Sequence, residues 1–179
     1  MEMANEPASP KAAGISFIEL KDGTIVNGKT ITYPQPEQID FSKIDFFKRQ
    51  VRNDDWIGID ERKVPVETIY GFQDNGVFRA LHLNRVLLRL EKGKLNLYSF
   101  KRDQENLSGS NMFKETVYVY EKIKGNFKAI DDRLDLFYES IADNTAAANL
   151  CKELFPYLSI PKMESSGEKL KRVVTLYNQ

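Results

Sequence analysis

Apolar and polar residues alternate in short runs over most of residues 15–130, and turn residues separate the runs. This period of two is typical of β-strands that bury one face. Asp22-Gly23, Asp74-Asn75-Gly76 and Lys124-Gly125-Asn126 lie between such runs, where glycine and asparagine supply the positive φ angles of tight hairpin turns. The pattern therefore predicts a succession of antiparallel hairpins from Ile15 to Ile130.

The runs also give the bounds of the predicted strands. Asn27-Gly28 predicts a second tight turn or a bulge, and residues 104–111 are expected to form a polar loop. Residues 39–49 fit both strand and helix spacing and are assigned to a strand. In the run 66–72, alternation places Tyr70 and Phe72 on one face. The other predicted strands are 15–20, 24–33, 56–59, 77–83, 86–91, 94–101, 114–122 and 127–130.

The period changes at Asp131, where apolar residues begin to recur at helical spacing. Asn144-Thr145 is expected to end a first helix and to cap a second helix over residues 146–155. Ser165 followed by Glu168 has the spacing of a capping box at the start of a third helix. Helices this short are marginal alone, so we expect them to pack on the sheet or on each other. The apolar stripes are Leu134, Phe137, Tyr138 and Ile141 in the first helix, and Leu170, Val173, Val174 and Tyr177 in the last.

These elements predict an α+β fold. A mostly antiparallel sheet of β-hairpins, or a partial barrel, is followed by two or three short C-terminal helices. The chain has 179 residues, 41% of them hydrophobic, which suits one globular domain with its own core. Residues 1–14 are interpreted as a flexible leader and 15–179 as a single domain, with 15–130 mainly β and 131–179 mainly helical.

Composition narrows the functional classes. Lys and Arg total 26, as do Asp and Glu, so the formal net charge is zero, whereas nucleic-acid binding favours a basic excess. No apolar run is long enough for a transmembrane helix, and residues 1–14 contain no apolar core of a signal peptide. The single cysteine, Cys151, excludes an intrachain disulfide and is expected to be a buried apolar side chain.

Candidate catalytic and metal-binding groups are few. Zinc sites need several Cys and His ligands, but the chain has one of each, so no metal and no cofactor are predicted. Asp54-Asp55 with Asp60-Glu61 is the densest acidic cluster before the helices; it lacks the spacing of a calcium loop and is interpreted as solvated. His82, which alternation places with Phe78 and Ala80, is expected to be a partly exposed structural residue. Nucleophile-elbow and phosphate-loop motifs are missing from the sequence.

Aromatic residues are the one compositional hint of binding. Tyrosine and tryptophan on strands can line a concave face that binds a sugar or a peptide, although they more often fill cores and cross-strand pairs. Burial of Tyr98 and Tyr120 would argue against the binding interpretation. The candidate ligand contacts are Trp56, Tyr70, Tyr98, Tyr118 and Tyr120.

Five phrases follow one another along the chain: residues 20–24 with Asn27-Gly28-Lys29, then 64–72, 93–98, 118–122 and 173–178. Their order resembles that of a group of uncharacterised cell-envelope proteins of Bacteroidota. The resemblance implies export through a signal peptide or lipoprotein signal, and it brings no catalytic residues. This sequence departs from the group because it shows no such signal. The expected location is periplasmic or outer-membrane-associated if a leader has been removed, and cytoplasmic otherwise.

Three functional hypotheses follow. The first is a non-enzymatic, envelope-associated binding or structural protein whose partner is an unknown protein or small ligand. The second is a carboxylate-based hydrolase acting on a glycan, which requires two acidic residues roughly 5–10 Å apart in a cleft. The third is a cytosolic protein–protein interaction domain that uses a sheet edge or a helical stripe and exposes an apolar patch of more than a few hundred Å².

Overall fold

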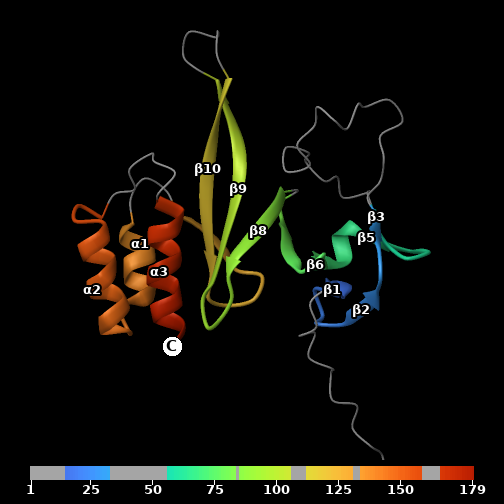
Figure 1. The fold of residues 1–179 in the computed structure, drawn as a ribbon, viewed down its shortest axis with the longest axis horizontal. Coiled ribbons are helices and arrows are strands. Elements are labelled where there is room, and N and C mark those ends of the chain that lie inside the picture. Colours follow the sequence, from blue (N-terminus) through green and yellow to red (C-terminus); the bar gives the residue numbers. More distant parts are fainter. Residues whose placement is uncertain (1–14, 33–55, 84, 106–111, 131–133, 159–165) are drawn as a thin grey trace, which may run out of the picture.

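A computed structural model of the chain has an α+β fold with two antiparallel sheets and three C-terminal helices (Figure 1). It describes residues 15–32, 56–83, 85–105, 112–130, 134–158 and 166–179. The larger sheet has eight strands in the order β11-β10-β9-β8-β7-β6-β1-β2. Its strands are β1 (Ser16–Leu20), β2 (Ile25–Gly28), β6 (Ile69–Asp74), β7 (Val77–His82), β8 (Arg85–Glu91), β9 (Asn96–Glu105), β10 (Met112–Glu121) and β11 (Phe127–Ile130).

The smaller sheet lies beside β1 and β2 (Figure 1). Its strands are β3 (Ile31–Thr32), β4 (Trp56–Ile59) and β5 (Arg62–Pro65), and the 3-10 turn η2 (Val66–Thr68) leads from it into β6. The three helices are α1 (Asp135–Ile141), α2 (Thr145–Leu154) and α3 (Ser166–Asn178). This arrangement confirms the predicted succession of antiparallel hairpins followed by helices.

The large sheet is strongly curled. In a flat sheet, four strand spacings of about 4.8 Å would separate β7 from β11 by roughly 19 Å. Instead, the rings of His82 on β7 and Phe127 on β11 lie 4.7 Å apart. The ring of Tyr70 on β6 stacks on Phe127 at 6.0 Å. Among the described residues no backbone pairing joins the edge strands β11 and β2, so the sheet is curled but is not a closed barrel.

The convex face of this sheet carries two apolar clusters. Strand register places Ile18, Phe72 and Tyr118 on the same face. At one end of the face, Ile18 and Phe72 pack with side chains of the small sheet, among them Ile57 and Ile59. At the other end, β9 and β10 pack against the three helices in a cluster that includes Tyr118. The small sheet and the helices therefore cover different parts of the same face.

The helices pack through the stripes that the sequence predicts. Leu134, Phe137 and Ile141 of the first stripe are at most 1% exposed, and the four residues of the α3 stripe are also buried. Asn144 caps α2, because its side chain accepts a hydrogen bond of 3.1 Å from the Ala147 N–H. The predicted cap is therefore confirmed.

The C-terminal end of α3 is tied to the sheet by one side chain. The Asn178 amide accepts a hydrogen bond from the Leu95 N–H and donates one to the Leu95 carbonyl, both at 2.9 Å. Next to this contact, a Cβ on Gly93 would lie only 2.2 Å from Asn178 Cγ. The turn between β8 and β9 therefore needs glycine for this close approach.

Three sequence predictions are wrong. Residues 66–68 form η2, not a strand. Tyr70 and Phe72 lie in different clusters, not on one face. The reason is a β-bulge at Tyr70: Ile69 pairs with Leu20 and Gly71 pairs with Glu19, so Tyr70 is an extra residue in β6. Asn27-Gly28 forms no turn or bulge, since both residues pair in regular register with β1. Gly28 instead leaves room for Ile59, whose Cγ1 would lie 2.4 Å from an added Cβ. The predicted loop 104–111 starts too early, because β9 runs to Glu105. The predictions for 39–49, Asp131 and Ser165 lie outside the described residues.

Candidate functional site on the concave face

The concave face of the curled sheet holds a buried carboxylate, Glu121, which is 1% exposed. Its Oε2 accepts hydrogen bonds from the Tyr70 hydroxyl at 2.7 Å, the Tyr98 hydroxyl at 2.9 Å and the Asn96 amide at 2.8 Å. Its Oε1 accepts a hydrogen bond of 2.6 Å from the Gly125 N–H. Four donors from β6, β9 and the β10–β11 turn thus converge on this one side chain of β10. We call these five residues the Glu121 cluster.

The two tyrosines of the Glu121 cluster are held as neutral donors. Their hydroxyl oxygens lie 3.0 Å apart, but each carries one proton, and both protons are directed at Glu121. Burial is the main reason that the pKa of Tyr70 and the pKa of Tyr98 lie far above the ordinary value of a tyrosine. Deprotonation of either hydroxyl at physiological pH is therefore not favoured.

Cations surround the Glu121 cluster without occupying it. Lys124 Nζ lies 4.7 Å from the centre of the Tyr70 ring and forms a 2.6 Å ion pair with Glu19 on β1. The guanidinium of Arg89 stacks on Phe78 at 3.9 Å, and desolvation is the main reason that its pKa is lowered. These contacts join β1 and β6 to the β10–β11 hairpin across the inside of the curl. The cluster therefore holds the two ends of the sheet together.

His82 and Cys151, the residues that nucleophilic chemistry would need, lie apart in the fold. His82 is half-buried against Phe127, and desolvation is the main cause of its lowered pKa. Cys151 is wholly buried in the helical cluster, as the sequence predicts, and burial raises the pKa of its thiol to about 11. At pH 7 the thiol is therefore protonated and shielded.

Thiol labelling tests this placement of Cys151. We expect Ellman's reagent at pH 8 to react with the native protein at least about 100-fold more slowly than with the protein in denaturant, because reaction requires an exposed thiolate. The labelling rate in water against that in guanidinium chloride is the measurement. Fast, complete labelling of the folded protein would contradict the buried position.

The five predicted ligand contacts are not gathered in one place. Tyr70 and Tyr98 lie together in the Glu121 cluster, whereas Tyr118 and Tyr120 point to the opposite face and pack under the helices. These four side chains are at most 8% exposed. Trp56 is half-buried on β4, where Lys63 lies over its ring at 4.5 Å. Burial of Tyr98 and Tyr120 argues against an open aromatic cleft formed by this set.

The acidic cluster proposed from the sequence is only partly described, since Asp54 and Asp55 lie outside the described residues. Asp60 adopts a positive φ of 53° and its carboxylate accepts hydrogen bonds from the Lys29 and Thr30 N–H groups. These backbone bonds are the main cause of its lowered pKa. Within the described ranges, no group of three or more His, Cys, Asp or Glu side chains is placed to hold a metal ion.

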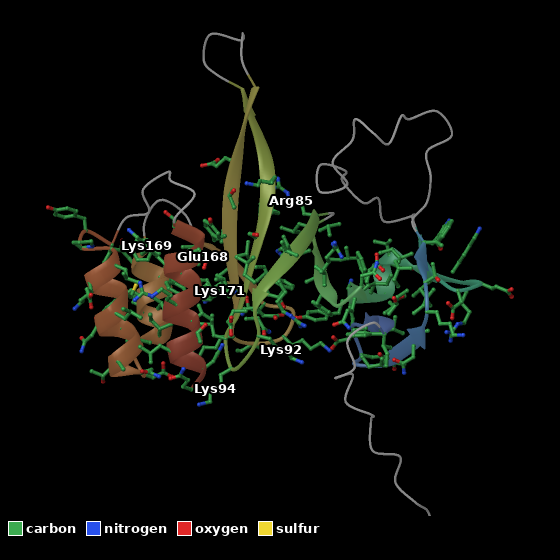
Figure 2. The ribbon with its side chains drawn as sticks, in the orientation of Figure 1. Arg85, Lys92, Lys94, Glu168, Lys169 and Lys171 are labelled. Atoms are coloured by element: carbon green, nitrogen blue, oxygen red, sulfur yellow. The ribbon has the colours of Figure 1, made fainter. Side chains whose placement is uncertain are left out.

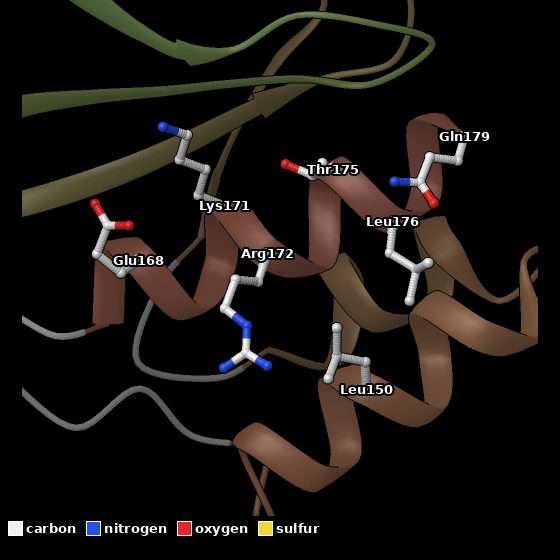
Figure 3. A pocket seen from close by; sticks show the side chains of 7 residues that line it. All are labelled: Leu150, Glu168, Lys171, Arg172, Thr175, Leu176 and Gln179. Atoms are coloured by element: carbon white, nitrogen blue, oxygen red, sulfur yellow. The ribbon is translucent and has the colours of Figure 1, made fainter.

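A shallow groove of about 370 Å³ lies between α2 and α3 (Figure 3). Leu150 and Leu176 face each other across it, and the exposed side chains of Lys171 and Arg172 flank it. The groove is open and only two apolar side chains line it, so it would enclose little of a ligand's surface.

None of the described helices is long and apolar enough to cross a membrane.

The hairpin of β9 and β10 projects beyond the other described strands and helices (Figure 1). Ten residue pairs join these strands, from Asn96↔Glu121 to Glu105↔Met112. Pairing of β9 with β8 ends at Ser99↔Leu88, and pairing of β10 with β11 ends at Tyr118↔Ile130. Above these points the hairpin is a two-stranded ribbon, residues 100–105 and 112–117, which we call the arm.

Arg85 lies where β8 and β9 separate at the base of the arm (Figure 2). Its guanidinium carbon lies over the ring of Phe100, 4.6 Å from the ring centre, and both side chains are half-exposed. The gap between the strands is bounded by Arg85–Leu87 on one side and by residues 100–105 on the other. We call this gap the fork.

Sequence reasoning missed the Glu121 cluster and the fork. The burial of Glu121 could have been predicted, because strand alternation places it on the same inward face of β10 as Val117 and Val119. An acidic residue at such a position predicts buried donors around it. Arg85 carries no comparable signal, since the separation of β8 and β9 is not encoded in a short pattern.

Comparisons with protein-family models, curated proteins and solved structures found no match to this chain.

Proposed function

We propose that the chain is a non-enzymatic binding protein of the bacterial cell envelope that engages a partner protein through the arm. The observation that carries the proposal is the arm itself, a ribbon of six residues per strand with both outer edges unpaired along its described length. Two-stranded ribbons are marginal alone, and open strand edges favour pairing with another chain. A partner that adds to an edge would satisfy these backbone groups.

The polar groups of the concave face support a non-catalytic role. Glu121, the most buried carboxylate there, uses both oxygens to hold four donors of the fold. Glu19 is ion-paired with Lys124. A hydrolase of the carboxylate type needs an acid and a base that both reach substrate. These two carboxylates are engaged in joining strands instead, which favours binding over hydrolysis.

Site-specific photocrosslinking in the native host tests the proposal. The gene, with its own start region, is expressed with a photoreactive residue in place of Lys101 or Thr116 on the arm, and in matched controls in place of Glu153 on the outer face of α2. We expect a discrete protein adduct from the arm positions, recovered in the envelope fraction, and none from the α2 position. Shortening the arm by joining residues 101 and 116 through a two-residue turn should abolish partner capture without changing the thermal midpoint by more than about 5 °C.

The outcomes separate the parts of the proposal. Adducts at the arm that fractionate with the cytosol would overturn envelope association and favour the cytosolic interaction domain. Equal adducts at the arm and at α2, or none at the arm, would overturn partner binding through the arm.

A further inference from the structure

At the fork the backbone pairing of β8 with β9 stops, although both strands continue. β9 continues for six residues beyond its last pair with β8, Leu88↔Ser99, a length of about 20 Å at the rise of a β-strand. On the other side, Arg85–Leu87 of β8 remain paired with β7. Among the described residues, no strand therefore pairs with this edge of β9 over the length of an ordinary strand.

Two cations stand at the base of the fork without a carboxylate partner among the described residues. The guanidinium carbon of Arg85 lies over the Phe100 ring, 4.6 Å from its centre, and the planar guanidinium carries five N–H donors. Lys101 follows Phe100 on β9 and hydrogen-bonds the Thr116 hydroxyl. A planar guanidinium with free donors is well suited to a carboxylate.

We propose that the fork binds an extended acidic segment of a partner protein, which adds as a strand to the open edge of β9 and places a carboxylate on Arg85. This inference rests on the proposed function and names the chemistry of the partner. Backbone pairing supplies affinity that does not depend on sequence, whereas the side chain facing Arg85 supplies selectivity. Charge complementarity makes an acidic strand the preferred occupant over a basic or neutral one.

The test uses defined peptides and the whole chain. The probes are two capped heptapeptides, acetyl-TVEVEVT-amide and acetyl-TVKVKVT-amide, titrated into ¹⁵N-labelled protein at low and high salt. We expect the acidic peptide to shift the amide signals of residues 100–105 and to bind roughly tenfold more tightly than the basic one, the factor that one well-placed charged contact supplies. The preference should decrease at high salt.

Variants assign the preference to Arg85. Arg85→Glu should reverse the order of the two peptides, and Arg85→Lys should keep the order with a smaller ratio, because the stacked planar group is lost. Arg172→Glu, the same charge change on the exposed face of α3, should leave the ratio unchanged. Circular dichroism and the thermal midpoint of each variant confirm that it is folded.

Several results would overturn the inference. They are equal affinity for both peptides, shifts that map to the groove between α2 and α3, or a lack of binding at millimolar peptide. Concentration-dependent self-association that Arg85→Glu abolishes would instead assign the fork to a second copy of the chain. If arm crosslinks are found while the peptides bind equally, the acidic segment is wrong and partner binding through the arm stands.

Discussion

Replacement of Glu121 by alanine is expected to lower the free energy of unfolding by about 3–5 kcal/mol, because several donors lose their common acceptor at a cost of about 1–3 kcal/mol for each buried one. The substitution would leave the Tyr70 and Tyr98 hydroxyls, the Asn96 amide and the Gly125 N–H without their acceptor. Tyr70 and Tyr98 are buried and Asn96 is half-buried, and an unsatisfied buried donor costs about 1–3 kcal/mol, whereas the exposed Gly125 can turn to water. Urea denaturation at pH 7 is the measurement.

Two further variants make this result specific. Glu121→Gln keeps an oxygen that can hold the three donors at the Oε2 position and turns an amide toward Gly125, so its loss should be about half as large. Glu153→Ala, an exposed change on α2, should stay within about 0.5 kcal/mol of the original chain. A loss below about 1 kcal/mol for Glu121→Ala would mean that the cluster does not hold the curled sheet together.

Replacement of Phe137 by alanine is the second change with a large expected effect, again about 3–5 kcal/mol. Phe137 is 1% exposed and meets the Tyr120 ring edge-on at 5.4 Å, so it joins α1 directly to β10. Its removal leaves a cavity between the helices and the sheet that the neighbouring elements can fill only in part.

The adjacent residue is a matched control. Leu136 is 68% exposed, and its contact with Tyr120 is made by the backbone carbonyl, which accepts the Tyr120 hydroxyl at 3.3 Å. Leu136→Ala should therefore change stability by less than about 0.5 kcal/mol. The two variants are compared by chemical denaturation followed with far-ultraviolet circular dichroism. Equal effects at 136 and 137 would contradict the helix–sheet packing.

The features predicted best from the sequence are those fixed within a few residues. Asn144 caps α2 because its side-chain oxygen and the Ala147 N–H are three residues apart, a spacing at which local geometry alone brings them together. The Asp22-Gly23 turn forms because Gly23 accepts a φ of 93°. The apolar stripe from Leu134 to Ile141 is buried because helical spacing puts its members on one side.

The features predicted poorly depend on contacts distant in sequence. Tyr70 turns to the concave face because β6 bulges against β1, and no local pattern in residues 66–72 reveals that pairing. The sequence predicts a turn or a bulge at Gly28, yet this glycine instead leaves room for Ile59 of β4. The Glu121 cluster likewise depends on the curl of the large sheet, and the fork depends on the point at which β8 and β9 stop pairing. The candidate site was therefore largely inaccessible to pattern reasoning.

The tie between Asn178 and Leu95 has a consequence for biosynthesis. The two residues are 83 positions apart, and α3 is the last described element to leave the ribosome. Until it emerges, Tyr118 and the apolar positions of β9 that α3 helps to cover stay open to water, and the nascent hairpin has exposed edges as well. At about 5–20 residues per second, that interval lasts for seconds. We therefore expect slow, late closure to be the kinetic signature of this topology.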